Sequence, residues 1–399
     1  MYTDEYEYDV LFADDEILYQ IAGQFGTPYY LYSEAGIAGS FSHLHQCFGW
    51  HSGFQQFFPA NFVPFRQMCR ILHRFQDGLM CSTLSELQMA KEEGFTAQRV
   101  LFSPMLPTTQ ELQLAKELDA SVTIDNLASL KLLLEQYRPK RVYLRLNVCE
   151  KIRVGAIAVV RSEKTKLGMT QAELFEAAQI LQTHGIESIG LEMKNTNMVM
   201  EDGFLAEVLR YLLQCAAKLK TLGIHVDCCN IGGGVGANYK PGMQEPSMQA
   251  VAQKVQAVYE EQCQALGLDG IQIQSALGRF LIAHHAILVS KVLLCKSLER
   301  EFVILDAASN ADTRSSINAY HHVSVAGKRQ RQNRSYWDVA GNWPSSTDRF
   351  AERRILPDLA PGDLCVIHDV GVRTSFSARA EKSRVLYLLE TGAIEEITL

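Results

Sequence analysis

Features that mark several protein classes are missing from this sequence. None of its ten cysteines forms a C-x-x-C pair, and Cys228 and Cys229 are neighbours in an apolar run. These spacings fit reduced thiols better than a disulfide framework, and they provide no zinc site. No apolar run is long enough to cross a bilayer, and residues 1–15 are acidic where a secretory signal is basic. We expect a cytoplasmic protein that holds no metal.

An excess of positive charge is also absent. The chain has 38 lysines and arginines, spread along its length, against 45 aspartates and glutamates, which gives a formal charge of −7. Without a basic face, neither nucleic acid nor an anionic membrane is an expected partner. The 399 residues, 47% of them hydrophobic, are enough for a large core. We therefore predict a large barrel and a smaller domain, with a small molecule or another protein as the partner.

Short apolar segments alternate with amphipathic segments along most of the chain. The segments predicted as strands are 56–58, 78–81, 100–102, 121–124, 141–144, 188–191, 224–227 and 271–273. The segments with helical periodicity are 83–93, 109–117, 126–137, 170–184, 204–222 and 247–266. About eight strand-helix units predict an α/β fold with a closed (β/α)8 barrel, whose functional groups lie at the carboxyl ends of the strands. An open doubly wound sheet is the alternative.

The two ends of the chain differ from this alternation. A helix is predicted at 15–25 and a strand at 29–32, where tyrosines are frequent. After Arg279 the chain has β-rich segments at 287–294, 302–305, 364–368 and 385–389, separated by polar loops around 330–335 and 342–348. This series of β-rich segments separated by polar loops predicts a second, β-dominated domain.

The most informative motif is the run Asn230-Ile-Gly-Gly-Gly-Val-Gly236. Three adjacent glycines let successive N–H groups converge on an anion, so a phosphate cup is one interpretation and a tight turn after a strand is the other. The spacing is not that of the dinucleotide motif G-x-G-x-x-G, and no P-loop lysine follows.

With these segments the chain resembles the fold-type III pyridoxal-phosphate (PLP) decarboxylases, the diaminopimelate, ornithine and arginine decarboxylase group related to alanine racemase. The resemblance runs almost end to end, and it is carried by the landmarks 25–30 (FGTPYY), 82–87 (STLSEL), 145–147 (RLN), 166–169 (KLGM), 231–234 (IGGG), 278–283 (GRFLIA), 306–307 (DA), 320–322 (YHH) and 359–363 (LAPGD).

The resemblance implies a cofactor-binding barrel at 34–281 and an antiparallel β-domain formed by 1–33 and 282–399. In the family the β-domain completes the site of a neighbouring subunit, so a head-to-tail homodimer is implied.

Five family roles are replaced in this chain. Pro59 stands where the family has the lysine that forms the Schiff base with PLP, and proline has no amine. Ala276 replaces the glutamate that pairs with the pyridine nitrogen, and Lys194, in Glu192-Met-Lys194, replaces the histidine that stacks on the ring. The family's catalytic cysteine segment is replaced by PSSTD at 344–348, and a family tyrosine is replaced by Arg373.

The anion-binding end of the family site survives. Gly232, Gly233, Gly234 and the pair Gly278-Arg279 match, and Arg373 adds a guanidinium suited to phosphate. We predict these six residues as cofactor-binding, although they could also only hold barrel loops together.

Other residues invite a site interpretation less strongly. Arg314 and Asp348 also match family positions and are expected in a dimer-interface ion pair. The pairs His284-His285 and His321-His322 are expected in packing, because neighbours on a strand point to opposite faces. Tyr336, Trp337 and Trp343 are expected in a polar loop.

Three functions remain open from the sequence. In the first, the protein has lost Schiff-base chemistry and binds a phosphorylated small molecule, or forms mixed dimers with an active homologue. In the second, it is a carboxy-lyase that still uses PLP through Lys194. In the third, Lys194, Glu192 or Arg373 carries out cofactor-free chemistry in the old cavity.

Overall fold

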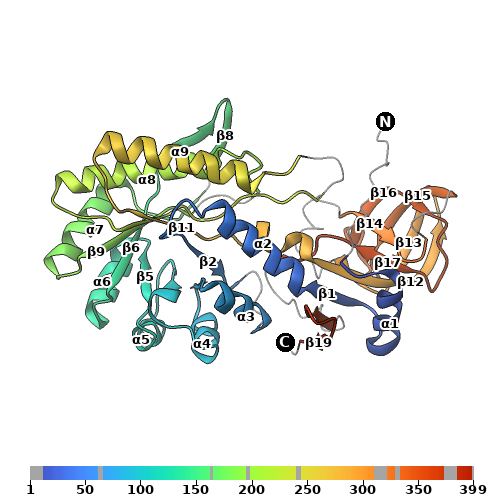
Figure 1. The fold of residues 1–399 in the computed structure, drawn as a ribbon. Coiled ribbons are helices and arrows are strands. Elements are labelled where there is room, and N and C mark those ends of the chain that lie inside the picture. Colours follow the sequence, from blue (N-terminus) through green and yellow to red (C-terminus); the bar gives the residue numbers. More distant parts are fainter. Residues whose placement is uncertain are drawn as a thin grey trace. The chain divides into compact units, whose positions relative to one another are not determined.

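The computed structural model describes residues 12–61, 66–161, 165–194, 198–239, 244–309, 321–328, 333–372 and 384–397. Arg314 and Arg373 lie outside these ranges. The described residues divide into two compact units, and Figure 1 shows the fold of each. One unit contains 41–236 and 246–278, and the other contains 1–40, 237–245 and 279–399, so the boundary falls within a helix, α2 (Glu34–Cys47).

Eight parallel strands close into a barrel in the first unit. In barrel order they are β10 (Cys228–Asn230), β11 (Gln272–Ser275), β2 (Gln55–Pro59), β3 (Gly78–Cys81), β4 (Val100–Phe102), β5 (Ser121–Ile124), β6 (Arg141–Arg145) and β9 (Ser188–Glu192). The closed barrel predicted from the strand-helix alternation is confirmed, and the open sheet is excluded.

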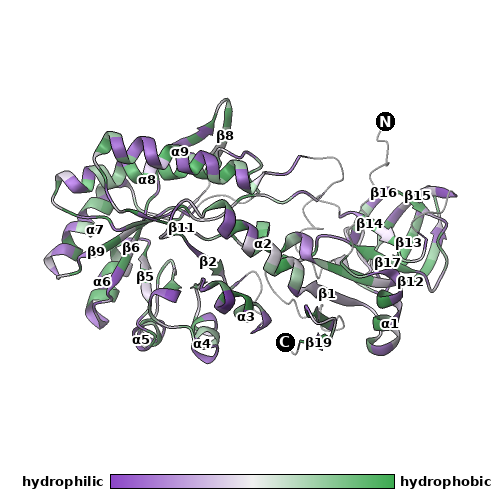
Figure 2. Cartoon of the chain, viewed as in Figure 1, coloured by the Kyte–Doolittle hydropathy of each residue, from purple (hydrophilic) through white to green (hydrophobic). Residues whose placement is uncertain are grey.

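Helices connect the strands on the outside of the barrel (Figure 1). They are α3 (Arg66–Phe75), α4 (Leu84–Glu92), α5 (Thr109–Glu117), α6 (Leu127–Gln136), α7 (Gln171–Thr183), α8 (Phe204–Thr221) and α9 (Met248–Leu266). In α8 the buried residues Leu205, Val208, Leu212 and Leu219 recur at helical spacing. Figure 2 shows the alternation of hydrophobic and hydrophilic residues along α8 and α9.

Large side chains fill the barrel interior. One layer contains Phe57, Met80, Leu101, Tyr143, Cys228 and Ala276. The two rings fit because the neighbouring strands carry glycine at the same level: a Cβ on Gly78 would come within 2.6 Å of the Phe57 ring, and one on Gly190 within 2.6 Å of the Tyr143 ring. The interior is therefore packed and leaves functional groups only at the strand ends.

Two parts of the barrel differ from the sequence prediction. The strand expected at 224–227 begins at Cys228, because the buried Ile224 and Val226 alternate before the chain joins the sheet. Helices α2 and α3 were not expected, and neither was a hairpin, β7 (Lys151–Val154) and β8 (Ile157–Arg161), inserted after β6. Tight turns at glycine permit such hairpins, and here Gly155 has a φ of +56°.

The second unit is built on a nine-stranded sheet. Its strands are β1 (Tyr29–Ser33), β12 (Ala286–Ser297), β13 (Glu301–Leu305), β14 (Val323–Val325), β15 (Arg334–Ala340), β16 (Arg349–Pro357), β17 (Leu364–Ile367), β18 (Arg384–Leu388) and β19 (Ile394–Glu396). Most pairs are antiparallel, but β1 with β18 and β13 with β15 are parallel. Strand β1 thus joins the start of the chain to its last third.

The core of this unit lies between the sheet and α1 (Asp15–Phe25). Leu18 and Ile21 of α1 are buried with Tyr29, Leu31 and Val289 of the sheet. The polar loop predicted around 330–335 already contains the start of β15, and Tyr336 and Trp337 lie within that strand. The charged residues of this strand are accommodated in two ways: Arg334 is exposed, and the buried Asp338 is paired with Arg300 and Arg349.

Two sequence expectations concern the chain as a whole. All ten cysteines are free thiols. In the ranges that the structure covers, no helix has the length and apolar character needed to span a membrane.

Substituting Gly78→Ala should lower the free energy of unfolding by about 1–3 kcal/mol, because the new methyl group meets the Phe57 ring and the Arg99 carbonyl oxygen. Urea unfolding of the two proteins measures the difference. Gly23→Ala in α1 is the control, since nothing lies within 4 Å of a Cβ there. It should leave stability unchanged or raise it by up to about 1 kcal/mol. Equal losses in both variants would contradict the packing argument.

Candidate functional site

Charged and polar side chains gather where the barrel strands end. Arg145 is the last residue of β6, Glu192 is the last residue of β9, and Asp125 follows β5 directly. Carboxyl ends of parallel strands meet at one face of a barrel, which is where sites in this architecture are built. The three side chains are almost completely buried, with exposed fractions of 1%, 1% and 4%. They form one network.

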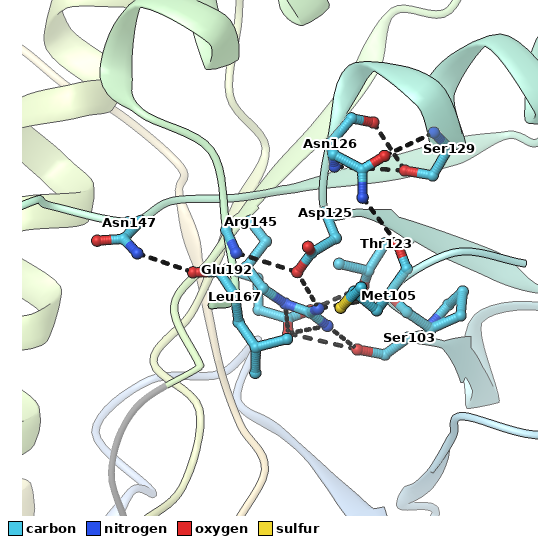
Figure 3. A network of polar contacts seen from close by, with 12 residues as sticks. Ser103, Met105, Thr123, Asp125, Asn126, Ser129, Arg145, Asn147, Leu167 and Glu192 are labelled. Atoms are coloured by element: carbon cyan, nitrogen blue, oxygen red, sulfur yellow. Dashed lines mark hydrogen bonds and ion pairs between the residues drawn. The ribbon is translucent and has the colours of Figure 1, made fainter. Parts of the chain in front are cut away.

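Arg145 is the centre of this network (Figure 3). Its Nε donates to Glu192 Oε1 at 3.0 Å and one terminal nitrogen donates to Asp125 Oδ1 at 2.6 Å. The other terminal nitrogen donates to the Ser103 hydroxyl and lies 3.0 Å from Glu192 Oε1. Thr123 donates to the second Glu192 oxygen at 2.7 Å, and the Gly168 N–H donates to Asp125 at 3.0 Å. The guanidinium is therefore fully engaged by protein groups.

The charges in the network stabilise one another. Burial disfavours a charged Arg145, but Glu192 and Asp125 outweigh burial and raise the pKa of its guanidinium. Two carboxylates around one guanidinium leave one negative charge in excess. This charge is held where water is almost excluded, so the geometry of the network depends on all three partners.

Lys194 lies beside this network, two residues beyond Glu192. Its side chain reaches solvent, yet protein surrounds the amine closely enough for desolvation to lower its pKa. The charge of Arg145 lowers that pKa further, while Glu192, Glu86 and Asp125 oppose the shift. An amine with a lowered pKa is a better nucleophile and base at neutral pH than an ordinary lysine.

Pro59 ends β2 and faces the barrel interior. It is two residues beyond Phe57, whose ring belongs to the interior layer, and alternate residues of a strand share one face. The N–H group that proline lacks is not needed for the hydrogen bonds between β2 and its neighbouring strands. Ala60 N donates to Met80 O on the β3 side at 3.0 Å, so the nitrogen of Pro59 faces β11, where pairing stops at Gln56. The strand thus accepts a proline, and no amine is present at its end.

The glycine run forms a tight turn after β10. Gly232 and Gly234 have φ values of +70° and +99°, and Gly232 N donates to Asn230 Oδ1 at 2.9 Å. A Cβ on Gly232 would lie 2.5 Å from Met193 O, and one on Gly233 would lie 2.2 Å from Ala276 O. Glycine is therefore required at these two positions by the chain itself, as the tight-turn interpretation predicts.

The same turn also leaves hydrogen-bond donors open. Within the described residues, the N–H groups of Gly233 and Gly234 have no acceptor, and both residues are half-buried. Two adjacent open N–H groups in a turn can hold an anion. The turn can therefore act as a phosphate cup while it packs against the barrel.

The remaining predicted residues fall in different places. Gly278 follows Leu277, whose backbone is bound by the Gln56 side chain. The Gln56 amide nitrogen donates to Leu277 O at 2.7 Å, and its amide oxygen accepts from Leu277 N at 3.1 Å. Arg279 belongs to the second unit, where it donates to the Tyr239 hydroxyl at 3.0 Å. Ala276 lies in the apolar interior layer of the barrel.

Comparisons with known proteins agree with this architecture. The family described as pyridoxal-dependent decarboxylase, pyridoxal binding domain, matches residues 35–283. The chain belongs to this decarboxylase family. Protein TabA of Pseudomonas amygdali pv. tabaci is 27% identical over 391 residues, covering 96% of this chain and 90% of TabA. Diaminopimelate decarboxylase of Methanothermobacter thermautotrophicus is 24% identical, covering 92% and 88%.

Solved structures of diaminopimelate decarboxylases share the fold. The enzyme of M. jannaschii, in complex with L-lysine, has a TM-score of 0.84 at 21% identity and covers 94% of this chain and 90% of its own. The enzyme of Helicobacter pylori, also with L-lysine, has a TM-score of 0.82 at 22% identity, covering 96% and 95%.

The residues at the carboxyl ends of the strands fit the phosphate of the family's cofactor but not its ring. The open N–H groups of Gly233 and Gly234 suit the phosphate. The buried, interior-facing Pro59 offers no amine to the aldehyde, and Ala276, which the resemblance aligns with the family's ring carboxylate, is apolar. No reaction step through the cofactor follows from these residues.

Sequence reasoning missed the roles of Asp125, Ser103 and Thr123, and treated Arg145 only as a family landmark. The signal was present, because a charged residue ends or follows three of the apolar strands: 121–124, 141–144 and 188–191. Glu192 was predicted as a catalytic candidate. Its carboxylate is bound by Arg145, Thr123 and Ser103, so it is not available as a free acid or base.

In the second unit the histidine pairs make separate contacts. His284 lies between Asp369 at 2.7 Å and Glu245 at 2.8 Å, while His285 contacts the Ser40 hydroxyl at 2.6 Å. His321 bonds to the His368 carbonyl. Asp348 accepts from Ser309 N and Trp343 N, and so fixes the loop between β15 and β16. Across the described ranges these groups form no metal-binding cluster.

Substituting Arg145→Met should lower the free energy of unfolding by about 3–5 kcal/mol, since it leaves Asp125 and Glu192 buried together without their cation. Chemical denaturation at neutral pH measures the loss. Lys140→Met removes an exposed ion pair with Asp119 and should cost less than about 1 kcal/mol. A loss from Arg145→Met no larger than that of the control would show that the network contributes little.

His284 makes stability depend on pH. Burial disfavours its charged ring, but the hydrogen bonds to Asp369 and Glu245 outweigh burial and raise its pKa from 6.5 to about 10. Because the folded pKa is the higher one, this stabilisation is complete below pH 6.5 and is lost as the pH rises through 10. We expect His284→Gln to lose stability relative to wild type at pH 6 and to match it near pH 10–11, as measured by urea unfolding. A difference independent of pH would contradict the assignment.

Proposed function

We propose that this decarboxylase-family protein has lost Schiff-base chemistry at the family's lysine position and acts by binding. The observation that carries the proposal is Pro59, buried at the interior-facing end of β2. An imine needs a primary amine, and proline provides none. The ligand class is a phosphate-containing small molecule, held by the Gly233 and Gly234 N–H groups, with Gly232 and Gly278 of the same unit as further candidates.

The apolar environment of Ala276 supports the same conclusion. A pyridine nitrogen that carries a proton is stabilised by a carboxylate, and a charge-assisted hydrogen bond of this kind contributes about 1.5–3 kcal/mol. Ala276 contributes no such bond and packs with Phe57 and Cys228. Both the covalent anchor and the group that makes the ring an electron sink are missing.

A second subunit is part of the proposal. The end of β12 and the turn after it expose Leu293, Leu294 and Leu298, with exposed fractions of 40%, 46% and 61%. Apolar side chains exposed together favour a protein contact. We propose a homodimer or a mixed dimer with an active homologue in the cytoplasm, and native mass measurement of the purified protein tests the subunit number.

A second candidate function is PLP-dependent decarboxylation through Lys194, and the lowered pKa of its amine favours this candidate. It requires that the Lys194 amine reach the aldehyde of a cofactor whose phosphate lies at the glycine turn. Lys194→Ala would then abolish the visible absorbance of the protein with PLP.

The experiment that separates the two functions is borohydride reduction in the presence of PLP, followed by peptide mapping. For the wild-type protein we expect no visible aldimine absorbance and no labelled lysine, whereas Pro59→Lys should gain both, with the label at residue 59. Pro59→Met is the control that removes proline without adding an amine. A label on any lysine of the wild-type protein overturns the binding proposal.

Phosphate recognition is tested without an aldehyde. Pyridoxine 5′-phosphate should bind the wild-type protein at least about ten-fold more tightly than pyridoxine, because a charged phosphate oxygen accepts from an N–H group more strongly than a neutral hydroxyl does. Isothermal titration calorimetry measures the two affinities. Equal affinities would contradict a phosphate ligand and leave the protein partner as the proposed role.

A further inference from the structure

The register of two barrel strands brings Lys194 next to the glycine turn. Strands β9 and β10 are parallel neighbours, and Glu192 is paired with Asn230. Two residues further along, Lys194 is level with Gly232, and neighbouring strands are about 4.8 Å apart. A backbone contact supports this alignment: the Met193 carbonyl oxygen lies 2.5 Å from the position that a Cβ of Gly232 would occupy.

Val199 also contacts the glycine turn. Val199 N donates to Gly234 O at 2.9 Å, and Gly236 N donates to Val199 O at 2.8 Å. The contacts of Met193 and Val199 flank Lys194 in sequence. Met193, the residue directly before Lys194, is therefore held against the turn independently of any ligand.

Arg145 and Lys194, at the carboxyl ends of the barrel strands, differ in what they can still bind. Arg145 is engaged by Asp125, Glu192, Ser103 and the Pro104 carbonyl oxygen. For Lys194, by contrast, the described residues supply no carboxylate oxygen within ion-pair distance, although the charges of Glu86, Glu192 and Asp125 act on it. Of these two cations, Lys194 is the one that can bind an anionic ligand.

The carboxylates near Lys194 do not prevent this. Asp125 and Glu192 share the charge of Arg145, so Lys194 balances the one negative charge left in the network. Glu86 accepts the Ser82 N–H at 2.6 Å at the amino-terminal end of α4, where the helix dipole favours a negative charge. With Glu86 included, these five groups carry one net negative formal charge, so an anion has to be held by local donors.

We propose that Lys194 supplies the cationic contact of an anion site whose hydrogen-bond donors are the N–H groups of Gly233 and Gly234, and that the site takes a phosphate monoester. This inference rests on the proposed binding function and names the residue that gives it charge specificity. Lys194 acts as an ionic anchor, and its amine forms no covalent bond with the ligand.

The test compares pyridoxine 5′-phosphate with pyridoxine on three variants, by calorimetry. Lys194→Met should weaken binding of the phosphate at least about ten-fold and leave pyridoxine unchanged, because one charge-assisted contact with the phosphate is removed. Lys194→Arg should retain most of the affinity. Lys131→Met, which changes an exposed lysine on α6, should bind both compounds as the wild type does.

The outcomes distinguish a failure of the proposed ligand class from a failure of the proposed role of Lys194. If the wild type itself does not prefer the phosphate, the proposed ligand class fails before any variant is considered. If the wild type prefers it but Lys194→Met does so equally, only the anchoring role of Lys194 is overturned. Borohydride labelling of Lys194 with PLP would also overturn it, since the amine would then face an aldehyde. Thermal unfolding of each variant shows that a loss of binding is not a loss of folding.

Discussion

The buried ion network around Arg145 is the interaction on which the barrel mouth depends. It joins β6, β9 and the ends of β4 and β5 through side chains that water barely reaches. A guanidinium with two carboxylates is favourable in such a place only when every partner is present. In consequence, the Glu192 carboxylate is held by the network, while the neighbouring Lys194 has no carboxylate within ion-pair distance among the described residues.

The glycine turn shows how one motif serves packing and binding together. Gly232 and Gly233 lie so close to Met193 O and Ala276 O that no other residue fits. The carbonyl groups of the turn are used by the barrel, since Gly232 O accepts from Ala276 N and Gly234 O from Val199 N. Among the described residues, the N–H groups of Gly233 and Gly234 have no acceptor. Packing alone therefore requires glycine at residues 232 and 233. A binding role depends on the N–H groups of Gly233 and Gly234.

Much of the fold was predictable because local signals are strong. Thr108 and Thr170 form capping boxes with Glu111 and Glu173, and they place the starts of α5 and α7 where periodicity predicted them. The barrel strands were found by their apolar runs. The errors arise where a local pattern competes with tertiary pairing: the alternation at 224–227 precedes β10, and the aromatic residues of β15 were read as a loop because charges surround them.

The sequence by itself determined the family, the barrel and the absence of an amine at residue 59, because these follow from chain order, periodicity and side-chain identity. Only the tertiary structure decided which charged groups are engaged. Asp125, Arg145 and Glu192 are far apart in sequence, and their pairing depends on the strand order that places β5, β6 and β9 side by side. Burial at that junction turns three ordinary charges into one network, and burial is a property of the packed molecule.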